Sequence, residues 1–138
     1  MRAVVAAVAL CVTAFSEESR QPSTWTDPKT NLTWAAADNG SAVSRSQAIE
    51  YCRSISLSGQ KDWRLPEIDE LQTLFGGTPD DRGHRLIGPL KLTGWAWSAT
   101  VGKESGQGWA LDFGDGARAS VADGDAGLNR ALCVRGAR

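Results

Sequence analysis

Two cysteines constrain the fold of this chain more than any other feature, because a bond between Cys52 and Cys133 would tie the middle of the sequence to its end. The third cysteine, Cys11, lies in the apolar start of the chain and is removed with it if that start is a signal peptide. Export would leave two cysteines in an oxidising compartment, where such a pair forms a disulfide. We therefore predict a Cys52–Cys133 disulfide, with two buried free thiols as the alternative.

Residues 1–16 have the layout of a secretory signal. A positively charged start precedes an apolar, uncharged run over residues 3–15, which is too short to span a bilayer, and small residues stand before the expected cleavage site. Leu10 is bulky where a lipoprotein signal carries a small residue, which disfavours lipidation of Cys11 and leaves it as an alternative. We predict an exported protein, periplasmic or extracellular, with no membrane span in the mature chain. The alternative for this run is a buried strand or helix.

Length and charge limit the remaining chain to one domain without a strong electrostatic field. Residues 17–24 are polar and are expected to be a flexible lead-in, and residues 25–136 are long enough for one modest hydrophobic core. Loss of Arg2 lowers the count of Lys and Arg from 15 to 14, against 16 Asp and Glu, so the mature net charge is −2. Nucleic acids and anionic membranes are therefore not expected partners.

The first half of the domain shows the signals of a hairpin and a helix. Turn-forming residues 27–31 separate Trp25 from Trp34 and favour a short hairpin with a tryptophan on each arm. Ser44 begins a capping box, and the apolar residues after it recur at helical spacing. We expect this helix to carry a cysteine on its buried face and to end before Gly59.

A second helix and a long loop are expected next. Pro66 suits the first position of a helix, because proline has a fixed φ and no N–H donor, and apolar residues share one face over residues 68–75. The two glycines that follow stop the helix. Residues 78–92 lack a clear period and predict a long loop. We expect Trp63 and Leu71 to be core residues.

The last third of the chain has the period-two pattern of half-buried strands. Residues 95–99 and 109–113 alternate between large apolar and small or polar side chains. Residues 114–116, Gly-Asp-Gly, predict a tight hairpin into a strand over residues 117–122, and a last strand over residues 132–135 follows an Asp- and Gly-rich loop. This order of elements predicts an α+β fold with two helices packed on a small antiparallel sheet.

Several short motifs resemble the Lcl C-terminal domain family of exported and surface bacterial proteins. The most specific is Asp62-Trp63-Arg64-Leu65-Pro66, which stands between the two cysteines and is followed by Glu70-Leu71. The other matching pieces span the mature chain: Trp25-Thr26-Asp27, Asn31-Leu32-Thr33-Trp34, Ala48, Tyr51-Cys52, Trp97-Ser98-Ala99-Thr100, Trp109, Phe113, Gly116 and Cys133-Val134-Arg135. Asn31 stands where the family commonly has glycine, which is a mild change because asparagine also tolerates positive φ.

The resemblance implies a C-type-lectin-like fold in which one disulfide ties the first helix to the last strand. Long loops near the later strands form the usual ligand surface of that fold. This would place six residues near the ligand: Asp112, Arg118, Asp123, Asp125, Asn129 and Arg130. At least one kind of member binds glycosaminoglycans as an adhesin, which requires basic patches. The mature chain is slightly acidic, and its candidate for a local basic patch is Arg82, Arg85 and Lys91.

The residues do not support catalysis or a cofactor. His84 is the one histidine and lies in a polar loop, and the two mature cysteines are expected to be bonded, so no nucleophile and base are indicated. Asp123 and Asp125 resemble the start of a calcium loop, but the remaining ligands of that motif are missing, and Asp-Gly pairs also form turns. We predict no enzyme, no cofactor and, as metal ligands, only these two minor calcium candidates.

Binding is therefore the leading hypothesis: an exported, non-catalytic, adhesin-like module that recognises a glycan or a protein partner at the cell surface or in the envelope. The alternative is a structural subunit of a surface or envelope assembly, which a large exposed apolar patch would favour. Two loop regions qualify as the ligand surface, residues 122–130 with their exposed charges and residues 78–92. Trp95 is expected to be partly exposed there. Core packing is expected for four other tryptophans, Trp34, Trp63, Trp97 and Trp109.

Overall fold

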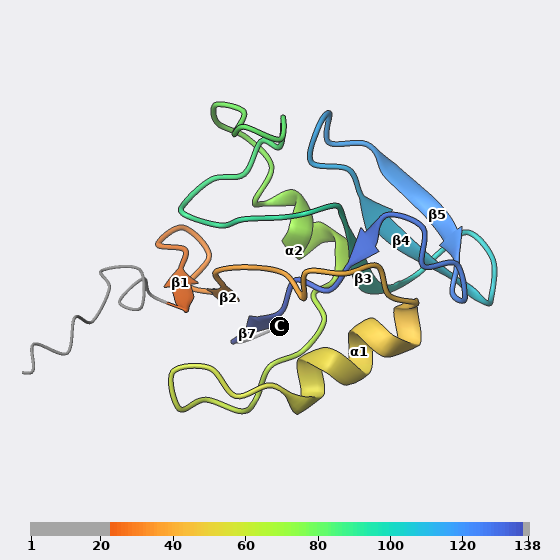
Figure 1. Ribbon diagram of the computed structural model, residues 1–138, viewed down its shortest axis with the longest axis horizontal. Helices are drawn as coiled ribbons and strands as arrows, with labels where there is room; N and C mark the ends of the chain where they lie inside the picture. The colour runs from red at the N-terminus through yellow and green to blue at the C-terminus, as the bar shows by residue number, and fades with distance from the viewer. Residues whose placement is uncertain (1–22, 137–138) are drawn as a thin grey trace, which may run out of the picture.

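The computed structural model describes residues 23–136, which form an α+β fold of two small sheets, two helices and one disulfide (Figure 1). The expected signal peptide at residues 1–16 lies outside the described residues. Strand β1 (Thr24–Thr26) begins inside the stretch that we expected to be a lead-in, so the ordered domain starts slightly earlier than predicted. Within residues 23–136, no helix has the length and apolar character that a membrane span requires.

The first sheet is built on the predicted tryptophan hairpin. Strand β1 pairs antiparallel with β2 (Thr33–Ala35), and Trp25 lies opposite Trp34. The connecting turn uses Asn31 at a φ of 61°, a conformation that asparagine tolerates better than most residues. The third strand, β7 (Val134–Arg135), comes from the end of the chain and pairs with β2. The hairpin prediction is therefore confirmed.

Helix α1 (Arg45–Ser54) begins at the predicted capping box. The backbone N–H of Gln47 donates to the Ser44 hydroxyl, and the backbone N–H of Ser44 donates to the Gln47 side-chain carbonyl. These two bonds satisfy amides that have no partner within the helix. Ala48 and Cys52 lie on the buried face, as the apolar spacing predicted.

Helix α2 (Ile68–Gln72) is shorter than predicted, and the expected start at Pro66 is wrong. Glu67 is extended, and the residue before it docks on the second sheet: the Pro66 carbonyl accepts the N–H of Ala99 at 2.7 Å. The Ile68 N–H donates to the Thr100 hydroxyl. With Glu67 extended as the N-cap, the helix begins at Ile68.

The second sheet has the strand order β5-β4-β3-β6. Strands β3 (Trp95–Val101), β4 (Gln107–Leu111) and β5 (Arg118–Ala122) are antiparallel, as predicted. Strand β6 (Asn129–Arg130) pairs parallel with β3, so the prediction of a purely antiparallel sheet is wrong at this edge. The parallel pairing arises because the last segment of the chain passes β3 on its way back to the first sheet.

The predicted tight hairpin between β4 and β5 is also replaced by a longer loop. Leu111 pairs with Arg118, which leaves six residues in the connection. Gly116 has a φ of 80°, and a β-carbon there would lie 2.9 Å from the Phe75 ring. The loop therefore needs glycine at this position for its backbone conformation and for close packing on the core.

Strand β3 separates two hydrophobic cores and is not half-buried as expected. Ala96, Trp97 and Ser98 are consecutive and all buried, because both faces of the strand are covered. Ala96 packs in one core with Trp34 and Leu71, and Trp97 packs in the other with Trp63 and both bonded cysteines.

Three of the four tryptophans expected in the core are buried: Trp34, Trp63 and Trp97. Trp109 is only partly buried, because its cross-strand neighbour is Ser120 on the edge strand β5. Trp95 is partly buried, as expected.

The predicted disulfide joins α1 to the C-terminal segment. The Cα atoms of Cys52 and Cys133 are 5.5 Å apart, and both residues are buried. The carbonyl of Cys133 accepts the N–H of Ala35, and Val134 exchanges two backbone hydrogen bonds with Arg64. The expected single strand over residues 132–135 is thus divided, because the chain leaves one sheet at Arg130 and enters the other at Val134.

Replacing both Cys52 and Cys133 by alanine should lower the free energy of unfolding by about 4–5 kcal/mol, because the bond closes a loop over a sequence separation of 81. Urea unfolding of the oxidised wild type and the double variant measures the difference. A loss below about 1 kcal/mol would show that the disulfide does not hold the C-terminal segment in place.

Leu71→Ala should cost about 2–5 kcal/mol, because Leu71 is fully buried at the centre of one core. Leu128→Ala is the matched control: the same substitution at a side chain 65% exposed should change stability by less than about 0.5 kcal/mol. Thermal unfolding of the two variants checks both values, and similar melting temperatures would contradict the core assignment.

Candidate functional site

The site residues suggested by sequence make separate sets of contacts. Asp112 accepts the N–H of Gly114 in the β4–β5 loop. Arg118 is bound to Gln72 and Asp69 of α2. The other candidates lie near β6 and the loop before it: Trp95, Asp123, Asp125, Asn129 and Arg130.

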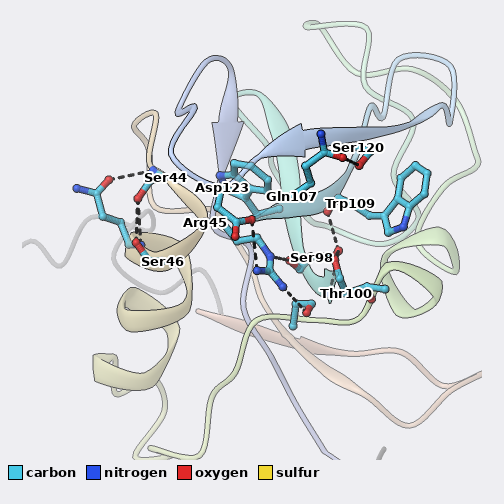
Figure 2. Close-up of polar contacts among 12 residues, drawn as sticks. Ser44, Arg45, Ser46, Ser98, Thr100, Gln107, Trp109, Ser120 and Asp123 are labelled. Atoms are coloured by element: carbon cyan, nitrogen blue, oxygen red, sulfur yellow. Dashed lines mark hydrogen bonds and ion pairs between the residues drawn. The ribbon is translucent and has the colours of Figure 1, made fainter. Parts of the chain in front are cut away.

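Asp123 belongs to a network centred on Arg45, the first residue of α1 (Figure 2). The Arg45 side chain is only 12% exposed, and its guanidinium donates to the carbonyls of Ser98 at 3.1 Å and Ala99 at 2.6 Å. Its ion pair with Asp123 is longer, at 3.4 Å. Gly108 makes room for the arginine, because a β-carbon there would collide with it.

The Arg45 network compensates for an irregularity in β3. The pairing of β3 with β4 shifts register between Trp97 and Val101, so the strand carbonyls there cannot all bond to β4. Arg45 binds two of them, and the Ser98 hydroxyl donates to the carbonyl of Trp109 (Figure 2). Asp123 joins this network through the long ion pair, and its side chain stays 38% exposed.

Arg130 and Asn129 are also less accessible than expected. Asn129 is buried, and its carbonyl accepts the N–H of Val43. The Nε of Arg130 donates to the Thr93 hydroxyl, and Thr93 in turn bonds to the carboxylate of Asp38. Asp125 is exposed.

A groove of about 930 Å³ lies elsewhere, between the segment that links β2 to α1 and the long loop between α2 and β3. Figure 1 shows that loop in green at the periphery of the molecule. Three stretches line the groove, residues 35–38, 80–82 and 88–92, together with Ser23, Tyr51 and Leu57. None of the candidates placed at residues 95–130 contributes to it.

Backbone hydrogen bonds fix the walls of the groove. Lys91 donates its N–H to the carbonyl of Ala36, and the carbonyl of Lys91 accepts the N–H of Asp38. Trp25 packs against Gly88, where a β-carbon would lie 2.7 Å from the indole ring. The ring of His84 is 3.1 Å from the carbonyl of Leu92 and joins the tip of the long loop to its end.

Two carboxylates of the groove are already used by the protein. Asp38 accepts the N–H of Thr93 at 2.6 Å and that of Gly40 at 2.8 Å. Asp80 accepts the N–H groups of Arg82 and His84, each at 2.9 Å. Desolvation disfavours ionisation of Asp80, but these amides and the neighbouring charges outweigh it and lower the pKa of the carboxyl below its ordinary value.

Other charged groups of the groove have no such partners. Asp81, Arg82 and Lys91 are exposed, and none of them takes part in the four ion pairs formed within residues 23–136. Tyr51 is partly buried beside them. Of the basic residues expected to cluster, Arg82 and Lys91 line the groove, whereas Arg85 donates to the carbonyl of Gly77.

The sequence predicted only part of the lining of the groove. Residues 78–92 were one of the two expected loop surfaces, but the contribution of residues 35–38, with three successive alanines at 35–37, was not recognised. The available signal was that alanine run directly after a strand, where small side chains leave space. In the part of the chain that the structure describes, no three His, Cys, Asp or Glu residues lie together as a metal site would require.

Arg45→Ala should destabilise the fold by about 3 kcal/mol, since it removes a charged donor from two partly buried carbonyls. Asp123→Ala should cost less than about 1 kcal/mol, because that carboxylate is 38% exposed and the ion pair is long. Denaturant unfolding of both variants tests this order, and equal losses would show that the ion pair is the main contribution.

Comparison with known proteins identifies the family of the chain. No curated protein matches the chain. The family model of the Lcl C-terminal domain matches residues 23–135, which is nearly the whole described structure. The chain therefore belongs to the Lcl C-terminal domain family.

Proposed function

We propose that this protein is an exported, non-catalytic binding module of C-type-lectin-like fold that recognises a glycan or a protein partner at the cell surface or in the envelope. Its ligand site is the groove between residues 35–38 and the loop 78–92. The fold assignment rests on the family motifs and on the disulfide between α1 and the C-terminal segment. The same disulfide supports export, because such bonds persist in oxidising compartments.

The main support for this proposal is that one groove combines a lining held by backbone hydrogen bonds with charged side chains that form no ion pair. Its volume of about 930 Å³ falls within the range of roughly 300–1,000 Å³ usual for ligand sites. Asp81, Arg82 and Lys91 are exposed at its rim without ion-pair partners. A rigid concave surface with unused charged groups is suited to binding a partner.

The alternative role, a structural subunit of an assembly, would be favoured by a continuous apolar patch. Within residues 23–136, the large apolar side chains that are mostly exposed are Val101 and Leu128, which belong to different elements. Single exposed apolar residues are ordinary on soluble proteins. The binding role is therefore better supported than the structural one.

Ala37→Trp should weaken ligand binding at least tenfold, because Ala37 is exposed and a large side chain there would fill the groove. Its melting temperature should stay within a few degrees of wild type, since an exposed position tolerates the change. The ligand is first identified by screening the oxidised mature domain on a glycan array and against a random-peptide library.

Asp125→Ala is the matched control, because Asp125 is exposed and belongs to the other candidate surface. It should leave both affinity and melting temperature unchanged. A ligand whose affinity falls with Asp125→Ala but not with Ala37→Trp would move the site to residues 122–130.

A further inference from the structure

Strand β5 forms one edge of the second sheet, and within residues 23–136 no strand pairs with its outer side. Figure 1 shows β5 near the margin of the molecule, on the side away from β1. Helix α1 packs on β3, and α2 packs on β3 and β4. The outer side of β5 is therefore open to a strand from another molecule.

The pairing of β5 with β4 determines which backbone groups face outward. The carbonyl of Ala117 accepts the N–H of Asp112 just before the strand, and the N–H of Asp123 donates to the carbonyl of Gly106 just after it. Bonded residues alternate along an antiparallel pair, and the register between these two points has no shift. The odd-numbered residues over 117–123 therefore bond to β4, and the even-numbered residues direct their backbone groups away from it.

Most of these outward groups have no hydrogen-bond partner. The N–H and carbonyl groups of Arg118 and Ser120 and the N–H of Ala122 form no hydrogen bond within residues 23–136. The carbonyl of Ala122 accepts the N–H of Asp125 in the following turn. A row of unpaired backbone groups at a sheet edge is a template for strand pairing.

The other sheet edges are short or covered, whereas β5 lacks the usual protection. Strand β1 has 3 residues, and β7 is bonded to Arg64. The carbonyl of Asn129 in β6 accepts the N–H of Val43. Proline, lysine and bulges commonly protect exposed edges. Strand β5 contains neither proline nor lysine, its pairing with β4 has no bulge, and its one charged residue stands at its end.

We infer that two copies of this protein pair antiparallel through β5, about a two-fold axis at Ser120. In this register the backbone groups of Ser120 bond to those of Ser120 in the other copy. The N–H of Ala122 donates to the carbonyl of Arg118 in the other copy, and the symmetry repeats this bond. The two four-stranded sheets then form one continuous sheet.

The sequence of β5 is compatible with pairing to itself. Ser120 faces its own copy, Ala119 faces Val121, and Arg118 faces Ala122, so within the paired strands no charge faces a charge of the same sign. A register centred on Arg118 would place two arginines opposite each other. The register centred on Ser120 avoids this and pairs the whole of β5.

The charges around the strand ends oppose this pairing only slightly. Arg118 already forms an ion pair of 2.9 Å with Asp69 of its own copy. Asp115 and Asp125 of different copies would approach each other beyond the strand ends, but both are exposed in turns. Exposed charges repel weakly at about 0.15 M ionic strength, so the association is measured there.

Pairing through β5 would leave the groove of each copy open. None of residues 118–122 lines the groove. A dimer therefore carries two grooves, and linked sites bind a surface with repeated ligands more tightly than one site does. The pairing itself does not depend on whether the groove binds a ligand.

Sedimentation velocity of the oxidised mature domain measures the association directly. An interface of two short strands is small, so a weak dimer should form as the concentration rises from about 10 μM to about 1 mM. Ala122→Pro removes an N–H that the monomer does not use, and it should weaken dimerisation at least about tenfold because the donor is lost twice. Its melting temperature should stay within a few degrees of wild type. Ala122→Ser is the matched control, because it keeps the N–H and should dimerise like wild type.

A pair of charged variants tests the register. Ala122→Arg places an arginine opposite Arg118 of the other copy, and Ala122→Glu places a carboxylate there. The arginine variant should dimerise about tenfold more weakly than the glutamate variant, because the pair occurs twice. General repulsion between copies would give the opposite order, since the mature chain has a net charge of −2 and the arginine reduces it.

Three outcomes would overturn the inference. The first is a wild-type domain that stays monomeric up to about 1 mM. The second is a dimer that a folded Ala122→Pro variant forms as tightly as wild type. The third is equal dimerisation of the Ala122→Arg and Ala122→Glu variants, which also decides the matter if the proline variant does not fold.

Discussion

The C-terminal segment is the part of the chain on which the rest of the structure depends. Residues 131–134 are all buried, and this run reaches both sheets, the loop before α1 and, through Cys133, helix α1 itself. The N–H of Asn39 and its side-chain carbonyl both bond to Ala131. A small domain gains much of its stability when one segment joins elements that are distant in sequence, and a disulfide keeps that segment in place.

The position of the groove follows from this arrangement. Ala35 is held by the carbonyl of Cys133, and the next residues leave the first sheet to pair with Lys91. Residues 35–38 are therefore anchored in the disulfide-bonded core, and the long loop is joined to them at Lys91. The loop contributes the exposed charges, as is common when a rigid scaffold presents a binding surface.

Local signals predicted the elements whose cause is local. The capping box at Ser44 and the turn at Asn31 required only neighbouring residues, and the structure confirms the hairpin and α1. The disulfide is not local, but a count of the two cysteines left after export was enough to predict it, and the structure confirms it. The start of α2 was mispredicted because the carbonyl of Pro66 accepts the N–H of Ala99 in β3, and Pro66 is not part of the helix. The ion pair of Asp123 with Arg45 joins residues that are distant in sequence, so no local pattern could reveal it.

We propose that the groove, and not the loop over residues 122–130, receives the partner. Amide chemical shifts of the labelled, oxidised domain, recorded while the selected ligand is added, test this most directly. If the groove is the site, the shifts change at residues 35–38, 80–82 and 88–92, and the shift of Asp125 does not. Changes confined to residues 112–130 would contradict it and return the ligand surface to the later strands.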